Sequence, residues 1–247
     1  MTTENIVVGL HAVRHALEHS LERVTEIWIQ EDKKNSQAIR ELLDIGNTLP
    51  VSHVKKQTLD RISGYQRHQG IAIRRKTVNS TARDLEELLE SSDMHSLLFL
   101  VIDGVQDPHN LGACLRTADA AGVNAVILPR DRSVGINTTV SKVASGAAES
   151  IPVFRVSNLA RSLGRLQTAG IWIIGTTETA QQSIYDTDLR RPVALVVGSE
   201  GQGLRENTRK HCDILVSIPM HGVVESLNVS VTTGICLYEV LRQRQIA

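Results

Sequence analysis

The chain has 247 residues, and its hydrophobic content of 41% is enough to bury the core of one large domain or of two ordinary ones. The 27 Lys and Arg residues are balanced by 27 Asp and Glu residues, which argues against a protein that holds nucleic acid by bulk charge alone. The three cysteines lack the spacing of a disulfide framework or a zinc ribbon, and the longest apolar run, residues 97–102, is too short to cross a bilayer. We therefore expect a cytoplasmic protein with reduced thiols and no membrane partner.

The first 78 residues are predicted to form a small α/β domain. Apolar residues recur at helical spacing in some of its segments and form short strand-like runs in others. The predicted elements are helices over residues 11–19 and 37–43 and strands over residues 24–29, 51–54 and 71–73.

Positive charge is concentrated in the second half of this domain. Residues 53–76 contain seven Lys and Arg residues against a single acid, Asp60. A polyanion would be attracted to such a stretch, but a solvated, lysine-rich surface has the same composition. The charge pattern leaves both interpretations open, and the aromatic content of 3% is too low to decide between them.

A second, larger domain is predicted over residues 96–247, after an acidic linker over residues 79–95 that contains one short helix. Buried-strand runs alternate there with helical segments, which is typical of a mostly parallel sheet. The predicted strands cover residues 97–102, 125–128, 171–174, 193–197 and 214–218, and a last helix covers residues 229–245.

A glycine-rich loop, Gly198-Ser199-Glu200-Gly201-Gln202-Gly203, follows one of these strands. It differs from a dinucleotide-binding fingerprint in the order of its glycines and in its position late in the sheet, so a Rossmann dehydrogenase is disfavoured. The glycines could serve only as turns. Glu200 between them could instead orient a cation or a hydroxyl group.

Two further polar clusters lie at predicted strand ends. Asn110 is placed to cap a helix that carries Arg116, and Ser226 and Asn228 precede the last helix. Taken singly, these residues could be helix caps and a surface arginine. The loop over residues 219–225 is long enough to wrap around a ligand, and the three clusters together indicate a pocket beyond the carboxyl ends of parallel strands.

Two other kinds of site are disfavoured. His11, His15 and His19 recur at helical spacing, but no cysteine or carboxylate cluster completes a metal site, so we expect no metal. Ser226 and Cys114 lack the G-x-S-x-G context of a nucleophile elbow, which makes hydrolase chemistry a poor hypothesis.

Three motifs in this order resemble those of the SpoU (SPOUT-class) RNA 2′-O-ribose methyltransferases. They are Asn110-Leu111-Gly112 with Arg116, Gly198-Ser199-Glu200-Gly201-x-Gly203, and Ile218-Pro219-Met220 leading to Ser226-Leu227-Asn228-Val229-Ser230. The likeness extends to the first domain, where Gly9-Leu10-His11-Ala12-Val13 and His68-Gln69-Gly70-Ile71-Ala72 are similar to the RNA-binding domain of one branch of the family. That branch acts on ribosomal RNA, and the run from Asp107 to Arg116 is similar to enzymes that methylate a guanosine ribose in the peptidyl-transferase loop of 23S rRNA.

The resemblance implies an α/β fold with a C-terminal trefoil knot, preceded by a small RNA-binding domain. Such a knot is an exception to the usual rule of unknotted connections. It also implies a homodimer that binds S-adenosyl-L-methionine in the knot. The implied cofactor contacts are Thr176, Gly198, Glu200, Gly201, Ile218, Met220 and Leu227.

The resemblance further implies which residues take part in the reaction. Arg116 would stabilise the developing ribose alkoxide, because an arginine is an awkward base. Glu200 would orient Arg116, and Asn110, Ser226 and Asn228 would hold the ribose, a phosphate or neighbouring loops. The expected substrate is a guanosine in 23S rRNA. The same chemistry on tRNA, or a noncatalytic knotted RNA-binding protein, is the alternative.

Overall fold

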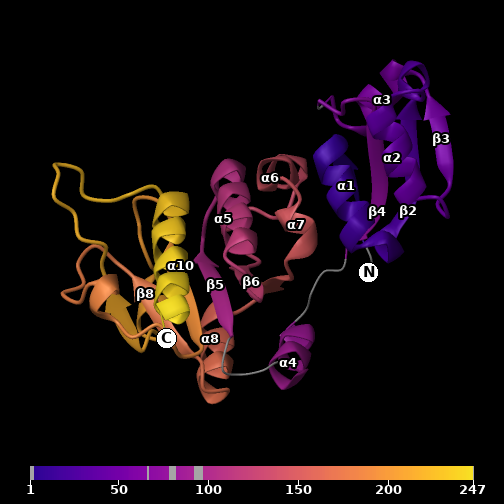
Figure 1. The fold of residues 1–247 in the computed structure, drawn as a ribbon. Coiled ribbons are helices and arrows are strands. Elements are labelled where there is room, and N and C mark those ends of the chain that lie inside the picture. Colours follow the sequence, from indigo (N-terminus) through magenta and orange to yellow (C-terminus); the bar gives the residue numbers. More distant parts are fainter. Residues whose placement is uncertain (1–2, 66, 78–81, 92–96, 247) are drawn as a thin grey trace. The chain divides into compact units, whose positions relative to one another are not determined.

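The computed structural model describes residues 3–65, 67–77, 82–91 and 97–246. The chain divides into two compact units, which are coloured along the sequence in Figure 1. Unit 1 comprises residues 1–79 and 136–150, and unit 2 comprises residues 80–135 and 151–247. No helix of the described residues is both long and apolar enough to span a membrane.

Unit 1 is built on a mixed sheet in which the described strands follow the order β1-β4-β2-β3. The strands are β1 (Thr3–Val8), β2 (Val24–Gln30), β3 (Val51–Val54) and β4 (Ile71–Thr77). Strand β4 pairs antiparallel with both β1 and β2, while β3 pairs parallel with β2. The first strand was not predicted from the sequence, because its polar residues obscure the apolar alternation.

Three helices accompany this sheet: α1 (Leu10–His19), α2 (Gln37–Ile45) and α3 (Lys56–Ile62). Apolar residues of α1 and α2, among them Leu17 and Leu42, are buried in one cluster with Ile27 and Ile73 of the sheet. A smaller cluster combines Leu59 of α3 with other sheet residues. Helix α3 was not predicted. Single 3-10 turns occupy Leu21–Arg23 and Glu31–Lys33.

Unit 1 also contains a segment that is distant in sequence, with helices α6 (Thr138–Ala144) and α7 (Ala147–Ser150). Arg75 of β4 donates to the backbone oxygen of Glu149 at 3.1 Å, and its guanidinium lies 3.8 Å from the Glu149 carboxylate. Burial raises the pKa of Glu149 to about 7, although the charge of Arg75 acts in the opposite direction. The domain boundaries predicted from the sequence, at residues 78 and 96, did not assign residues 136–150 to the first domain.

Unit 2 confirms the expected parallel sheet. Its described strands follow the order β10-β8-β9-β5-β6-β7, and every neighbouring pair is parallel. The strands are β5 (Leu98–Asp103), β6 (Ala125–Pro129), β7 (Val153–Val156), β8 (Trp172–Thr176), β9 (Val193–Gly198) and β10 (Ile214–Val216). The prediction missed β7, whose four residues include the charged Arg155.

The helices of unit 2 are α4 (Ala82–Ser91), α5 (Pro108–Ala120), α8 (Leu159–Thr168), α9 (Glu206–Arg209) and α10 (Val229–Ile246), with a 3-10 turn at Ile184–Asp186. Helix α10 packs against α5 and β9, and Figure 1 shows α10 beside α5. Strand β5 is buried at every position, which explains its continuous apolar sequence. This arrangement brings the starts of α5 and α10 to the edge at which the strands end.

Candidate active site

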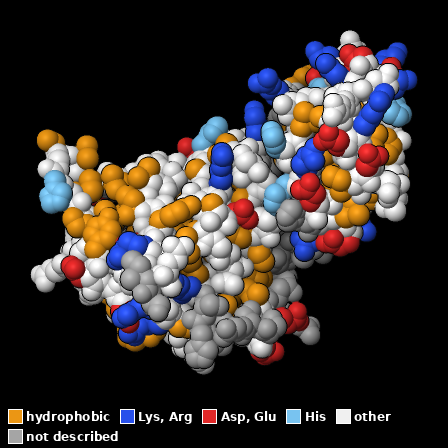
Figure 2. All heavy atoms as spheres, in the orientation of Figure 1, with side chains coloured by type: hydrophobic (Ala, Val, Ile, Leu, Met, Phe, Trp, Pro, Cys, Tyr) orange, Lys and Arg blue, Asp and Glu red, His pale blue; other side chains and the backbone are white. Residues whose placement is uncertain are grey.

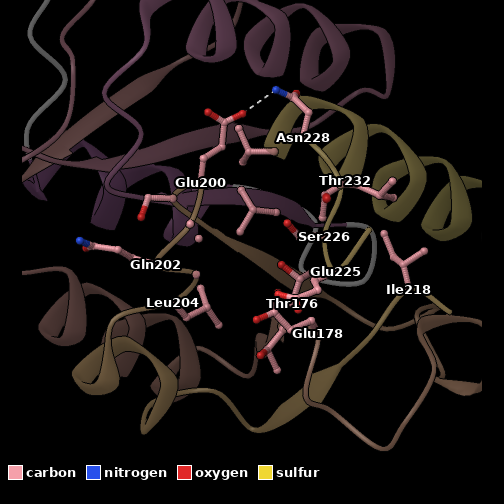
Figure 3. A pocket seen from close by; sticks show the side chains of 18 of the residues that line it. Thr176, Glu178, Glu200, Gln202, Leu204, Ile218, Glu225, Ser226, Asn228 and Thr232 are labelled. Carbon is pink, nitrogen blue, oxygen red and sulfur yellow. Dashed lines mark hydrogen bonds between the residues drawn. The ribbon is translucent and has the colours of Figure 1, made fainter. Parts of the chain in front are cut away.

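A cavity of about 630 Å³ opens at the carboxyl ends of β8 and β9, and Figure 3 shows it from close by. Its volume lies within the range of about 300–1,000 Å³ that is typical of small-molecule sites. The expected cofactor contacts all line this cavity: Thr176, Gly198, Glu200, Gly201, Ile218, Met220 and Leu227. The structure thus gathers residues from three separate loops, which follow β8, β9 and β10, into one site.

The glycine-rich loop forms one wall of this cavity. Ser199 and Gly203 exchange backbone hydrogen bonds of 3.1 and 2.9 Å, so the chain turns back directly after β9. A β-carbon at position 198 would overlap the carbonyl group of Gly203, and Gly201 adopts a left-handed φ of 77°. The loop therefore requires glycine at these positions for its own geometry.

Asn228 joins the three polar clusters. Its Nδ2 donates to Glu200 Oε1 at 2.6 Å, the contact drawn in Figure 3, and to Asn110 Oδ1 at 3.0 Å. Its Oδ1 accepts from the backbone nitrogen and the hydroxyl of Ser230 at 2.9 and 2.6 Å, which caps α10. The residue is both a helix cap and a bridge between the site residues.

Asn110 has a different local role from the one predicted. The cap of α5 is Asp107, whose side chain accepts from the backbone nitrogen of His109 at 2.8 Å, and Pro108 occupies the first helical position. Asn110 therefore lies inside the first turn of α5. Its side chain does not cap the helix and accepts a hydrogen bond from Asn228 instead.

A second cavity of about 390 Å³ adjoins the first and shares Ser199, Glu200, Gln202 and Val229 with it. Asn110, Arg132 and Arg205 also line this second cavity. Glu200 lines both cavities, and Asn228 of the first cavity bonds to Glu200 and to Asn110 of the second, so the two ligand spaces adjoin as a group-transfer reaction requires.

Sequence reasoning missed Arg205 and the acid that holds it. Asp103 is completely buried at the end of β5, and it accepts from the backbone nitrogen of Arg205 at 3.0 Å. The Arg205 guanidinium lies 3.5 Å from the Asp103 carboxylate, at a place that a side chain at Gly104 would occupy. The sequence feature that could have identified this pair is Asp103 itself, an acid at the end of an otherwise apolar strand.

Arg116 is the predicted site residue that the structure does not bring to the others. It lies in the middle of α5, is exposed, and lines neither of these two cavities. Ser226, in contrast, lines the first cavity, which Figure 3 shows.

The described residues hold no group of three or more His, Cys, Asp or Glu side chains that could bind a metal ion. All three cysteines are free thiols. Burial raises the pKa of Cys114 to about 11 and those of Cys212 and Cys236 to about 12. Each thiol is therefore protonated near neutral pH and is a poor nucleophile.

Comparison with known proteins agrees with this geometry. Residues 97–238 match the family model described as the SpoU rRNA Methylase family. The chain belongs to this family. Residues 6–80 match a second model, described as RNA 2′-O ribose methyltransferase substrate binding, so the resemblance seen in the sequence is confirmed for both segments.

Relatives of this SpoU methylase cover its whole length. A protein of Shewanella oneidensis named 23S rRNA (guanosine-2′-O-)-methyltransferase RlmB is 49% identical over 99% of this chain and 100% of its own. A protein of the same name from Ralstonia nicotianae is 49% identical over 100% of this chain and 98% of its own. The crystal structure of the SpoU methyltransferase AviRb from Streptomyces viridochromogenes is 25% identical, with a TM-score of 0.84 over 98% of this chain and 90% of that one.

Proposed function

We propose that the chain transfers a methyl group from S-adenosyl-L-methionine to the ribose 2′-hydroxyl of a guanosine in 23S rRNA. The observation that carries the proposal is Asn228, which joins Glu200 and Asn110 where the two cavities meet. The names of relatives 49% identical over nearly the full chain support the choice of RNA and nucleoside.

The first cavity fits S-adenosyl-L-methionine in size and in chemistry. Leu204, Ile218 and Leu227 provide apolar surface for an adenine ring, and Glu225 provides a carboxylate for a cationic amino group. A β-carbon at Gly201 would meet nothing within 4 Å, so the backbone of this loop is open to a ligand. When bound, the cofactor supplies an activated methyl group on its sulfonium.

The second cavity would hold the target ribose. Asn110, which lines this cavity, and its hydrogen-bond partner Asn228 would bind the nucleotide. Arg205, anchored by the buried Asp103, would offer a positive charge to a phosphate. The 2′-hydroxyl must pass its proton to a base or to water as the new bond forms. A guanidinium beside its oxygen would stabilise the developing negative charge, which is the role proposed for Arg116.

Because Arg116 lines neither of these two cavities, we propose that it acts across a homodimer interface. Helix α10, which packs against α5, leaves Val231 and Tyr238 about half exposed one heptad apart. These apolar side chains fit an interface with a second copy of the chain. The C-terminal trefoil knot implied by the resemblance is part of the same proposal, supported by the family and by the parallel sheet.

Unit 1 would bind the RNA, in the cytoplasm where ribosomes are assembled. The match of residues 6–80 to the substrate-binding model supports this assignment. So does the basic stretch of residues 53–76, and Figure 2 shows exposed Lys and Arg side chains on unit 1, interspersed with acids.

The test is to incubate the purified protein with S-adenosyl-L-methionine and either unmodified 23S rRNA or bulk tRNA, followed by digestion and mass spectrometry of the nucleosides. Ribose-methylated guanosine from 23S rRNA alone is the expected result. Product from tRNA alone would support the proposed methyl transfer but would show that the substrate is not 23S rRNA. Cofactor binding without product from either RNA would point to a missing partner or to another RNA, whereas the absence of both cofactor binding and product would favour a noncatalytic RNA-binding protein.

A further inference from the structure

Helix α3 of unit 1 ends in a Schellman motif that places an aromatic residue outside the fold. The backbone nitrogen of Tyr65 donates to the Asp60 oxygen at 2.6 Å, and that of Gly64 donates to the Arg61 oxygen at 3.1 Å. Gly64 takes the left-handed conformation that this motif requires, with a φ of 61°. Tyr65 follows with a left-handed φ of 60°, which is unusual for a bulky residue.

The side chain of Tyr65 does not make the contact that usually accompanies this motif. An apolar residue at this position normally packs back onto the last turns of the helix. Here the corresponding helical residue is Asp60, whose carboxylate binds His68 at 2.9 Å, and Tyr65 remains 80% exposed. The folded unit therefore gains little from an aromatic ring at this position.

The backbone around Tyr65 is held from both sides. His68 is buried, and its Nδ1 accepts from the Gly70 nitrogen at 3.0 Å, so its Nε2 carries the proton that Asp60 accepts. The Oε1 of Gln69 accepts from the Leu10 nitrogen at 3.0 Å. Tyr65 thus directly follows the end of α3, and His68 and Gln69 are bonded to α3 and to the start of α1.

Basic residues flank Tyr65 in the sequence, and the single acid among them, Asp60, binds His68. Lys55, Lys56, Arg61 and Arg67 are exposed, and none of them is paired with a carboxylate of the described residues. The remaining cations of the basic stretch include Arg74, which stacks on Trp28 at 4.9 Å, and the buried Arg75. Asp60, the single acid of the stretch, is occupied by His68.

We propose that Tyr65 is a stacking platform for an unpaired base of the RNA substrate, with Lys55, Lys56, Arg61 and Arg67 contacting the adjacent phosphates. The proposal rests on the proposed function, because it takes unit 1 as the RNA-binding unit. Single-stranded RNA is recognised by just this pairing of aromatic faces with basic side chains, whereas a paired helix offers no free base to stack. Loss of one base that stacks on an aromatic ring weakens binding by about tenfold.

The experiment measures the affinity of the full chain for unmodified 23S rRNA at several salt concentrations. The variant is Tyr65→Asn, because asparagine tolerates a left-handed backbone and keeps the end of α3 intact. We expect binding about tenfold weaker with an unchanged salt dependence, since no charge is lost. Tyr65→Phe should bind like the unchanged protein, and Lys55→Gln with Lys56→Gln should bind more weakly with a shallower salt dependence.

The matched control is Tyr185→Asn, which removes a half-exposed tyrosine from unit 2 and should leave the affinity unchanged. A fully paired RNA duplex should bind the Tyr65→Asn variant as well as the unchanged protein. Equal affinity of Tyr65→Asn and the unchanged protein for 23S rRNA would overturn the proposal, as would an equal loss in Tyr65→Phe. If the unchanged protein binds 23S rRNA but forms no methylated product, the proposed function fails while the stacking result still stands.

Discussion

Replacing Asn228 separates its two structural tasks. The side chain caps α10 through its Oδ1 and reaches Asn110 and Glu200 through its Nδ2. Serine is an equally good helix cap but is too short to make the two bridging contacts. Asn228→Ser should therefore damage the site and spare the helix, whereas Asn228→Ala should damage both.

The geometry sets the size of both effects. The bond to Glu200 has a charged acceptor, for which the net contribution is about 1.5–3 kcal/mol, and its loss from the transition state corresponds to a decrease of about 10- to 150-fold in kcat/KM. Loss of the cap costs about 1 kcal/mol, which lowers the Tm of a domain of this size by about 2–4 °C. Both variants should lose activity, and only Asn228→Ala should have a lower Tm than the unchanged protein.

Methyl transfer to 23S rRNA and thermal unfolding measure these effects on the same preparations. A kcat/KM of Asn228→Ser within twofold of the unchanged protein would refute the idea that this bridge assembles the site. A decrease in Tm equal to that of Asn228→Ala would refute the assignment of the cap.

Three further substitutions test other parts of the structure. The pKa of Glu149 in the folded protein, about 7, lies above its ordinary 4.5, so the free energy of unfolding of unit 1 should fall by about 3 kcal/mol as the pH rises from about 4.5 to above 7. Glu149→Gln should abolish this decrease, as followed by the fluorescence of the buried Trp28; an unchanged pH dependence would contradict the assignment. Gly198→Ala should force the loop away from Gly203 and weaken S-adenosyl-L-methionine binding at least tenfold by calorimetry, whereas equal affinity would show that the loop is not part of the site. Arg116→Ala should lower kcat more than a hundredfold with cofactor affinity unchanged, and near-normal turnover would remove Arg116 from the reaction.

The sequence predicted unit 2 well because its strands are buried on both faces. A strand such as β5 then reads as a continuous apolar run, and the helices between such runs give the alternation of a parallel sheet. The predicted ends of these strands lie within about two residues of the observed ones, so the site loops follow closely. The family resemblance implied that Thr176, Gly198 and Ile218 contact one cofactor, and all three line the first cavity.

Other features depend on contacts that no local pattern records. Strand β1 carries Glu4 and Asn5 and is strand-like only because it pairs along β4. Helix α7 joins unit 1 through Glu149, which is about 70 residues away from its partner Arg75. In the sequence, Arg205 cannot be distinguished from other surface arginines, because its partner Asp103 lies about 100 residues before it.

The same physical arrangement explains why the site needs the whole of unit 2. Asn110 belongs to the first turn of α5, Asn228 caps α10, and these two helices pack against each other. The bond between the two asparagines therefore forms only when both helix starts are in register at the edge of the sheet. Glu200 is positioned by the glycine-rich loop after β9, so the bond from Asn228 to Glu200 also depends on the turn that Ser199 and Gly203 close. A change that shifts α10 would thus alter both cavities at once, even if it touches neither ligand.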